Sequence, residues 1–310
     1  MKIFIIGWFD EFLETIKIAA LEFLARGFIV ETCGNFNHIE FNEFCMNKIT
    51  VFNPDFILVW NIYQDECFIK QLSKKYKLLM FNWDDPHVLK NKIFFNTIKY
   101  YDICFTSCIE TCKIYNEFSR HVYLLPPVDS KIHYYDYDPL YDCDIAVIIT
   151  NLYKEEEYYK NQIINRYKLI CELVKHFKVN IYGPKYLENE FCNQYKEYIP
   201  YGLNRKVFSS AKLVLNTHVE NAYGYFNERT IDIMACSGLM LIDRVKGIEL
   251  LDNCCIVLED SIDKIINQIK YILEHIKDYE YIRNNAYQKS KEFHVQKWCD
   301  VIINHVSTIL

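Results

Sequence analysis

Short apolar strands alternate with amphipathic helices along most of this chain, and this alternation constrains the fold more than any other feature. The apolar run 2–6 ends at Gly7, the apolar residues of 11–26 recur at helical spacing, and a second apolar run covers 28–32. Strands buried on both faces form continuous apolar runs, and strand–helix–strand units place their strands in parallel. The sequence therefore predicts an α/β fold of doubly wound parallel sheets.

The alternation falls into two blocks, as expected for 310 residues at ~100–200 residues per domain. The first block continues with strands expected at 55–60, 77–81, 103–106 and 122–125 and a helix at 109–118. The second predicts strands at 144–149, 179–182, 212–216, 239–242 and 255–258, and helices at 161–176, 204–210, 228–236, 262–275, 279–292 and 295–309. Between them lies the aperiodic, aromatic and acidic stretch HYYDYDPLYD. We therefore expect a first domain at 1–133, a linker at 134–142, a second domain at 143–293 and a final segment at 294–310.

The net charge and the cysteine content limit which binding partners and which cellular compartment we expect. A net charge of −6 without a long Lys/Arg run argues against a nucleic-acid partner. The sequence has no apolar run of about 18 residues, so no transmembrane segment is expected. Thirteen cysteines without a secretory leader predict thiols in a reducing compartment, the cytoplasm. The sequence leaves open whether the chain forms a homo-oligomer.

Parallel open sheets bind ligands beyond the carboxyl ends of their strands, so the informative residues should directly follow the predicted strands. The turn after the first strand lacks the second and third glycines of Gly-x-Gly-x-x-Gly and carries carboxylates instead. No Walker loop is present either. Both absences argue against a nicotinamide-dependent dehydrogenase and a P-loop NTPase.

The segment 225–243 is the strongest candidate for a binding site. It reads as a loop, a short helix, a turn of small residues and a buried strand. A helix N-terminus is a favourable seat for phosphate, and Arg229 offers a fork of donors suited to a diphosphate. Asp232, one turn further along, offers acceptors for ribose hydroxyls. From spacing alone, an ordinary amphipathic helix with a solvated Arg–Asp pair explains the segment equally well.

The stretch FNERTIDIMACSGLMLID at 226–243 resembles the donor-site helix of GT-B glycosyltransferases, and is most similar to the spore-maturation-type group. NWDDP at 82–86, DICFTS at 102–107 and LLPPVD at 124–129 resemble further segments of that group, in the same order along the chain. The resemblance implies two Rossmann-like domains facing across a cleft. It also implies a nucleotide-sugar donor on the second domain, an acceptor on the first, and a final helix that packs back on the first domain.

With this resemblance, we assign seven residues to the donor site: Arg229, Asp232, Asn227, Glu228, Gly183, Lys185 and Asn216. An exposed surface lysine remains the simpler explanation for Lys185. Thr217 and His218 follow the same strand as Asn216 and are further candidates, although a single histidine is more often structural.

The acceptor and the catalytic groups are expected in the first domain. Asp84 and His87 follow a predicted strand, and either offers a base for an acceptor hydroxyl, provided that reach and pKa suit. Gly7, Trp8 and Asp85 are assigned to the acceptor. A helix N-cap is an alternative role for Asp85, because Asp-Asp-Pro is favourable at a helix start.

The sequence departs from the resembled pattern at two positions. Gly224 stands where many retaining GT-B enzymes carry the first of two acidic residues, and Ser237 is an extra residue beside Ala-Cys-Gly. Two Asp-x-Asp matches, at 136–138 and 142–144, resemble a metal motif only superficially, so we expect no metal ligands.

The resemblance implies transfer of a sugar from a nucleoside diphosphate sugar, with retention of configuration and without a bound metal or other cofactor. The acceptor is a glycan, a protein or a small molecule. Two alternatives remain. One is a non-catalytic glycan- or nucleotide-binding or structural protein that keeps the fold, and the other is a nucleotide-sugar epimerase of the same architecture. Fold alone does not separate them.

Overall fold

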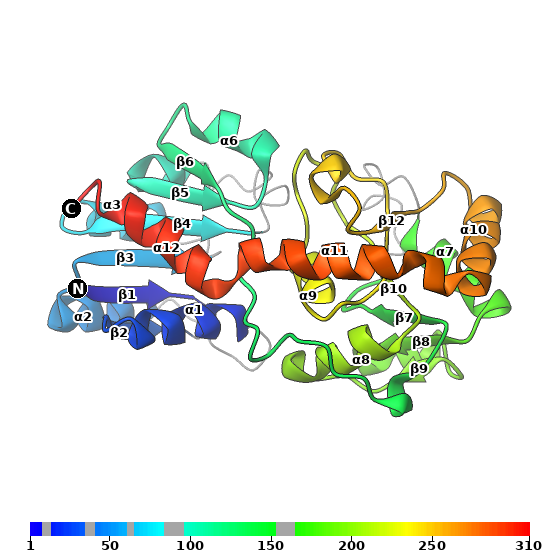
Figure 1. Ribbon diagram of the computed structural model, residues 1–310. Coiled ribbons are helices and arrows are strands. Elements are labelled where there is room, and N and C mark those ends of the chain that lie inside the picture. The colour runs from blue at the N-terminus through cyan, green and yellow to red at the C-terminus, as the bar shows by residue number, and fades with distance from the viewer. Residues whose placement is uncertain (8–13, 35–40, 61–64, 84–95, 153–164) are drawn as a thin grey trace. The chain divides into compact units, whose positions relative to one another are not determined.

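The computed structural model describes residues 1–7, 14–34, 41–60, 65–83, 96–152 and 165–310 (Figure 1). The chain divides into two compact units. Unit 1 comprises 1–127, 222–226 and 293–310, and unit 2 comprises 128–221 and 227–292. The stretch 134–142 therefore belongs to unit 2. Within the described ranges, no helix is both long and apolar enough to cross a membrane.

Unit 1 is built on a parallel sheet of six strands in the order β2-β1-β3-β4-β5-β6. The strands are β1 (Lys2–Ile6), β2 (Ile29–Cys33), β3 (Phe56–Trp60), β4 (Lys77–Asn82), β5 (Ile103–Thr106) and β6 (Arg120–Tyr123). The helices are α1 (Glu14–Ala25), α2 (Phe41–Phe52), α3 (Glu66–Ser73), η1 (Ile98–Tyr100), α6 (Ile109–Tyr115) and α12 (Val295–Val306). All five residues of β3 are buried, as expected for a central strand covered on both faces.

Unit 2 holds a second six-stranded parallel sheet, in the order β12-β11-β10-β7-β8-β9. Its strands are β7 (Ile145–Ile148), β8 (Val179–Tyr182), β9 (Tyr195–Lys196), β10 (Leu213–Asn216), β11 (Met240–Ile242) and β12 (Ile256–Val257). Its longer helices are α7 (Arg166–His176), α8 (Asn204–Ser210), α9 (Glu228–Ala235), α10 (Ile262–Glu274) and α11 (Glu280–Ser290). Short 3-10 helices are η2 (Pro139–Tyr141), η4 (Lys185–Asn189), η5 (Tyr201–Leu203), η6 (Ile248–Leu251) and η7 (Ile276–Tyr279), and η8 (Lys291–Phe293) leads into α12.

The C-terminal helix α12 belongs to unit 1, although it follows unit 2 in sequence (Figure 1). Trp298 is buried, and its ring centroid lies 5.3 Å from that of Trp60 at the end of β3. Arg26, after α1, donates to the carboxylate of Asp300 and to the carbonyl oxygen of Gln296. Aromatic packing and these charge-assisted hydrogen bonds attach α12 to the sheet of unit 1.

The short segment 222–226 also packs within unit 1, on the start of α6. The backbone N–H of Glu110 donates to the carbonyl oxygen of Tyr223 at 3.1 Å, and the N–H of Tyr223 donates to the Glu110 carboxylate at 2.9 Å. The hydroxyl of Tyr123 donates to the carbonyl oxygen of Gly224 at 2.9 Å. Gly224 has a φ of 76°, and an added Cβ would lie 2.7 Å from the side chain of Ile109. The backbone and its neighbour therefore favour glycine here, which explains why no acidic side chain occupies this position.

The prediction of an α/β fold with two parallel sheets is confirmed. The strands expected at 2–6, 103–106 and 179–182 and the helix expected at 204–210 have the predicted bounds, and the bounds of the other predicted elements differ by a few residues. Helices α2 and α3 and the two-residue strand β9 were not predicted.

Candidate functional site

The carboxyl edge of the unit 2 sheet holds the best-defined polar cluster. The strand order changes direction between β7 and β10, and open sheets bind ligands in the crevice at such a switch point. Asn216 is the last residue of β10 and pairs in register with Ile242 of β11. The residues that follow these two strands, Thr217 and Asp243, consequently lie at the same edge.

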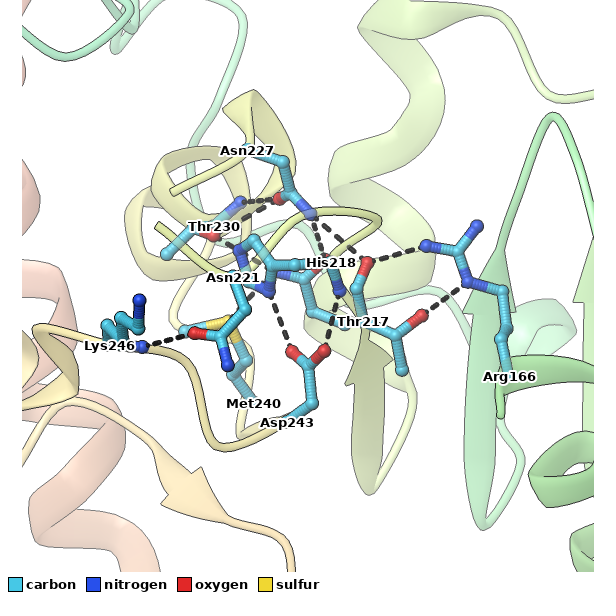
Figure 2. A network of polar contacts seen from close by, with 10 residues as sticks. Arg166, Thr217, His218, Asn221, Asn227, Thr230, Met240, Asp243 and Lys246 are labelled. Carbon is cyan, nitrogen blue, oxygen red and sulfur yellow. Dashed lines mark hydrogen bonds and ion pairs between the residues drawn. The ribbon is translucent and has the colours of Figure 1, made fainter. Parts of the chain in front are cut away.

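Asn227 joins the start of α9 to the end of β10 (Figure 2). Its side-chain oxygen accepts from the backbone N–H of Thr230 at 3.1 Å, which makes it the N-cap of α9. Its amide nitrogen donates to Oδ1 of Asn216 at 3.0 Å and to the carbonyl oxygen of Thr217 at 3.3 Å. Asn216, which is fully buried, donates in turn to Oγ1 of Thr230 at 2.9 Å. The predicted donor residues Asn216 and Asn227 are thus brought together, and they hold the N-terminus of α9 against the strand end.

Arg166, which was not predicted as a site residue, extends this network toward β7. It is the first residue of α7 and is only 5% exposed. Its guanidinium donates to Oγ1 and to the carbonyl oxygen of Thr217, at 2.6 and 2.7 Å, and to the carbonyl oxygen of Asn151 at 2.9 Å. A buried arginine supplies positive charge at the carboxyl edge of the sheet, which favours an anionic ligand there. No local motif marks it, since its partners are distant in sequence.

His218 and Asp243 form a buried pair on the other side of Thr217 (Figure 2). Nδ1 of His218 lies 2.7 Å from Oδ1 of Asp243, and the backbone N–H of His218 donates to Oδ2 at 2.9 Å. Nearby, Asn221 accepts from the backbone N–H of Lys246 at 2.8 Å. The loop after β10 is therefore attached by side-chain contacts to the loop after β11.

Asp232 lies on α9, one turn beyond the N-cap, and is 3% exposed. The hydroxyl of Tyr201 donates to its Oδ1 at 3.4 Å, and Nε2 of His133 lies 3.7 Å from the same oxygen. Within the described part of the chain, Oδ2 accepts no hydrogen bond. Burial, together with the charge of Glu228, raises the pKa of Asp232 well above its ordinary value, and Arg229 acts in the opposite direction. The carboxyl therefore keeps one oxygen available to a ligand and holds its proton to higher pH than an exposed aspartate.

The other predicted donor residues lie near the same edge or on the same helix. Gly183 follows β8, and a Cβ there would overlap the carbonyl oxygen of Ile149, so only glycine fits. Lys185 is exposed at the start of η4. Glu228 begins α9, where its carboxylate accepts from Tyr201 at 3.2 Å, and Arg229 follows with a partly buried side chain.

Comparison with solved structures identifies this architecture. Sucrose-phosphate synthase from Thermosynechococcus elongatus superposes with a TM-score of 0.75 at 9% identity, with all of both chains covered. Anabaena HepE in complex with UDP and glucose superposes at 0.69 and 12% identity, with 99% of each chain covered. A glycosyltransferase from Rickettsia africae gives 0.65 and 10%, covering 99% of this chain and 98% of the other. At these identities the similarity shows the fold alone. The chain has the GT-B fold.

One sequence family also matches. Residues 166–302 match the model of a family described as glycosyl transferase-like, which is less than half of the chain. The matched range begins at Arg166, continues beyond α9 and includes every side chain of the polar cluster at the carboxyl edge of unit 2. No curated protein sequence matches the chain significantly. The more specific resemblance to the spore-maturation-type group stays a prediction.

The acceptor-side and catalytic predictions concern unit 1 and stay predictions. Gly7 ends β1, where its N–H donates to the carbonyl oxygen of Cys33 at 3.1 Å. The remaining four predicted residues lie outside the residues that the structure describes: Trp8, Asp84, Asp85 and His87.

Three of the four aspartates in the two Asp-x-Asp matches form ion pairs. Arg205 lies 2.9 Å from Asp136, Lys206 lies 2.9 Å from Asp138, and Lys212 lies 2.8 Å from Asp144. Among the described side chains, His, Cys, Asp and Glu form no group of three arranged to hold a metal ion.

Proposed function

We propose that the chain is a glycosyltransferase that moves a sugar from a nucleoside diphosphate sugar to an acceptor hydroxyl. One observation carries the proposal. The glycosyl transferase-like match at 166–302 contains the polar cluster at the topological switch point of unit 2, and that cluster positions the N-terminus of α9. Two structures of the same fold are described as complexes of HepE with UDP and with UDP-glucose, so we propose UDP-glucose as the first donor to test.

The donor would bind at the start of α9, with Asn216 and Asn227 holding the helix in place. The helix dipole favours negative charge at this end, and the guanidinium of Arg229 suits a diphosphate. Oδ2 of Asp232 would accept hydrogen bonds from the ribose. The backbone at Gly183 and the ammonium group of Lys185 would face the donor from the end of β8.

In the reaction, the bond between the anomeric carbon and the diphosphate oxygen breaks, and a bond from that carbon to the acceptor oxygen forms. Arg229 and the α9 N-terminus would stabilise the leaving diphosphate electrostatically, without a metal. Asp84 or His87 would take the proton of the acceptor hydroxyl, and Gly7, Trp8 and Asp85 would contact the acceptor. We also propose retention of configuration and a reducing compartment. The thirteen cysteines, all of which are free, support the second of these proposals.

The conformation of Gly224 supports one alternative, a binding protein that keeps the fold without catalysis. A side chain at this position would be strained, so the acid expected from the resemblance cannot simply be restored. Slow hydrolysis of a donor sugar separates the alternatives, because a binding module would release no nucleoside diphosphate. An epimerase would convert the sugar without any acceptor.

A thermal-shift panel of nucleotides and nucleotide sugars tests the proposal. A ligand at 100 times its Kd stabilises the native state by about 2.7 kcal/mol. We expect UDP and UDP-glucose to raise the Tm and uridine, which lacks the diphosphate, to leave it nearly unchanged. A panel in which no nucleoside diphosphate or nucleotide sugar raises the Tm would contradict the proposed donor site.

A further inference from the structure

A histidine that the sequence analysis did not single out is buried beside Asp232. His133 is 2% exposed, and its ring packs edge-on against that of Tyr201 with centroids 4.9 Å apart. Its Nε2 lies 3.7 Å from Oδ1 of Asp232, which is beyond hydrogen-bond distance. Among the described residues, neither ring nitrogen has a hydrogen-bond partner. Unsatisfied buried polar groups are rare in native proteins, so this one calls for an explanation.

Among the described residues, the ionisable groups around the pair formed by His133 and Asp232 are Glu228, Arg229 and Cys236 of the α9 segment, Tyr201 of η5, and Arg205 of α8, which is paired with Asp136. Burial, and secondarily Arg205, lowers the pKa of His133 to about 3, while burial raises that of Asp232. Burial therefore disfavours the charged form of both groups, and when the unliganded pair holds one proton, that proton lies on the carboxyl group.

We propose that His133 is a positioning residue that takes this proton from Asp232 when the ribose of a nucleoside diphosphate binds. The O–H bond of the carboxyl breaks and an N–H bond forms on Nε2 of His133. The pair keeps one proton and no net charge, and no other reactant is needed. The inference rests on the proposed function, since it requires the nucleotide to contact Asp232.

The geometry suits such a transfer. A carboxylate only accepts hydrogen bonds, so Oδ2 of ionised Asp232 can accept from ribose hydroxyls. A carboxylic acid is a weaker acceptor here because its own O–H group also needs an acceptor. Tyr201 holds Oδ1 on the side that faces His133. An ionised carboxylate at this distance favours the imidazolium, and an approach of about 1 Å gives a charge-assisted hydrogen bond of normal length. The otherwise unsatisfied ring nitrogen then gains its partner in the liganded state.

The consequence is a nucleotide affinity that depends little on pH, because the proton stays within the protein. Without His133 the proton must leave to solvent. The affinity would then fall about tenfold for each unit by which the pH drops below the pKa of Asp232.

Isothermal titration calorimetry with UDP tests the proposal, using buffers of different ionisation enthalpy so that proton release is counted. The proteins are the wild type, His133→Phe, which keeps the aromatic packing on Tyr201, and His121→Phe as control. His121 is a partly buried histidine whose pKa is also lowered, but it lies in unit 1. The ionisation of UDP itself is common to all three. We expect His133→Phe to release about one proton more than the other two and to lose affinity at acidic pH. Equal proton release by all three would overturn the proposal.

A second measurement does not depend on the folding of a variant. In wild-type protein labelled with ¹⁵N-histidine, the nitrogen shifts of His133 should change from neutral imidazole to imidazolium when UDP is added. A neutral His133 in the UDP complex overturns the proposal while leaving the proposed donor site intact. If the wild type binds no UDP, both the proposed function and this inference are wrong.

Discussion

Asn227→Ala tests whether the contact between α9 and β10 stabilises unit 2. Loss of an Asn N-cap costs about 1 kcal/mol. The substitution also removes the donor to Oδ1 of the fully buried Asn216, and a stranded buried acceptor costs about 1–3 kcal/mol. We therefore expect Asn227→Ala to lower the free energy of unfolding by about 2–4 kcal/mol in total.

Asn165→Ala is the matched control. Asn165 is the N-cap of α7 in the same unit, and among the described residues its side chain accepts from the backbone N–H of Lys168 alone. It should lose only the cap contribution, about 1 kcal/mol. All four tryptophans fall within the ranges of unit 1, so urea unfolding of unit 2 is best followed by far-ultraviolet circular dichroism. Equal losses for the two variants would refute the argument that Asn227 does more than cap its helix.

Three further predictions concern stability. Gly224→Ala should lower the free energy of unfolding by more than about 1 kcal/mol, because the φ of Gly224 is positive and the added methyl group would meet Ile109. Tryptophan fluorescence during urea unfolding measures this loss, and an unchanged unfolding midpoint would count against the strain. Ser237→Gly should raise stability by about 0.5–1 kcal/mol, since Ser237, which follows the C-cap Cys236 of α9, has a φ of 55°. A loss of stability would contradict this. Burial lowers the pKa of His121 to about 4, which is below its value in the unfolded chain. Between these two pKa values the unfolded state binds one more proton than the folded state, so stability is lost as the pH falls from about 6.5 towards 4. His121→Phe should flatten this acid limb in pH-dependent thermal melts, and an identical limb would contradict the assignment.

The strands were predictable because a buried parallel strand is a continuous apolar run with a clear end. The run ICFT at 103–106 and the run VNIY at 179–182 became strands with the predicted bounds. The helix α2 was missed because its buried stripe is narrow: Phe41, Cys45 and Ile49 are its only buried residues. The two residues of β9 are too few to leave a pattern.

Part of the candidate site could be predicted because polar residues at a strand end or a helix start gather at one edge of the sheet. Asn216, Asn227 and Asp232 were named on this ground, and the structure gathers them at the α9 segment. Their role in donor binding stays a proposal. Arg166 and His133 could not be identified, because each acts on partners that lie far away in the sequence. The departure at Gly224 was visible in the sequence, but its cause, a left-handed backbone packed on Ile109, depends on tertiary structure.

The affinity of UDP for wild-type protein and for Arg229→Ala, measured by isothermal titration calorimetry, tests the central claim most directly. Loss of hydrogen bonds between a guanidinium and a diphosphate should weaken binding by about 1.5–3 kcal/mol, or roughly 10- to 150-fold. Arg120→Ala is the control, because Arg120 is exposed in unit 1 and donates to Thr308. The account predicts that UDP binds the wild type and Arg120→Ala equally, and Arg229→Ala far more weakly. A correctly folded Arg229→Ala protein that binds UDP as tightly as the wild type would contradict the placement of the donor at the N-terminus of α9.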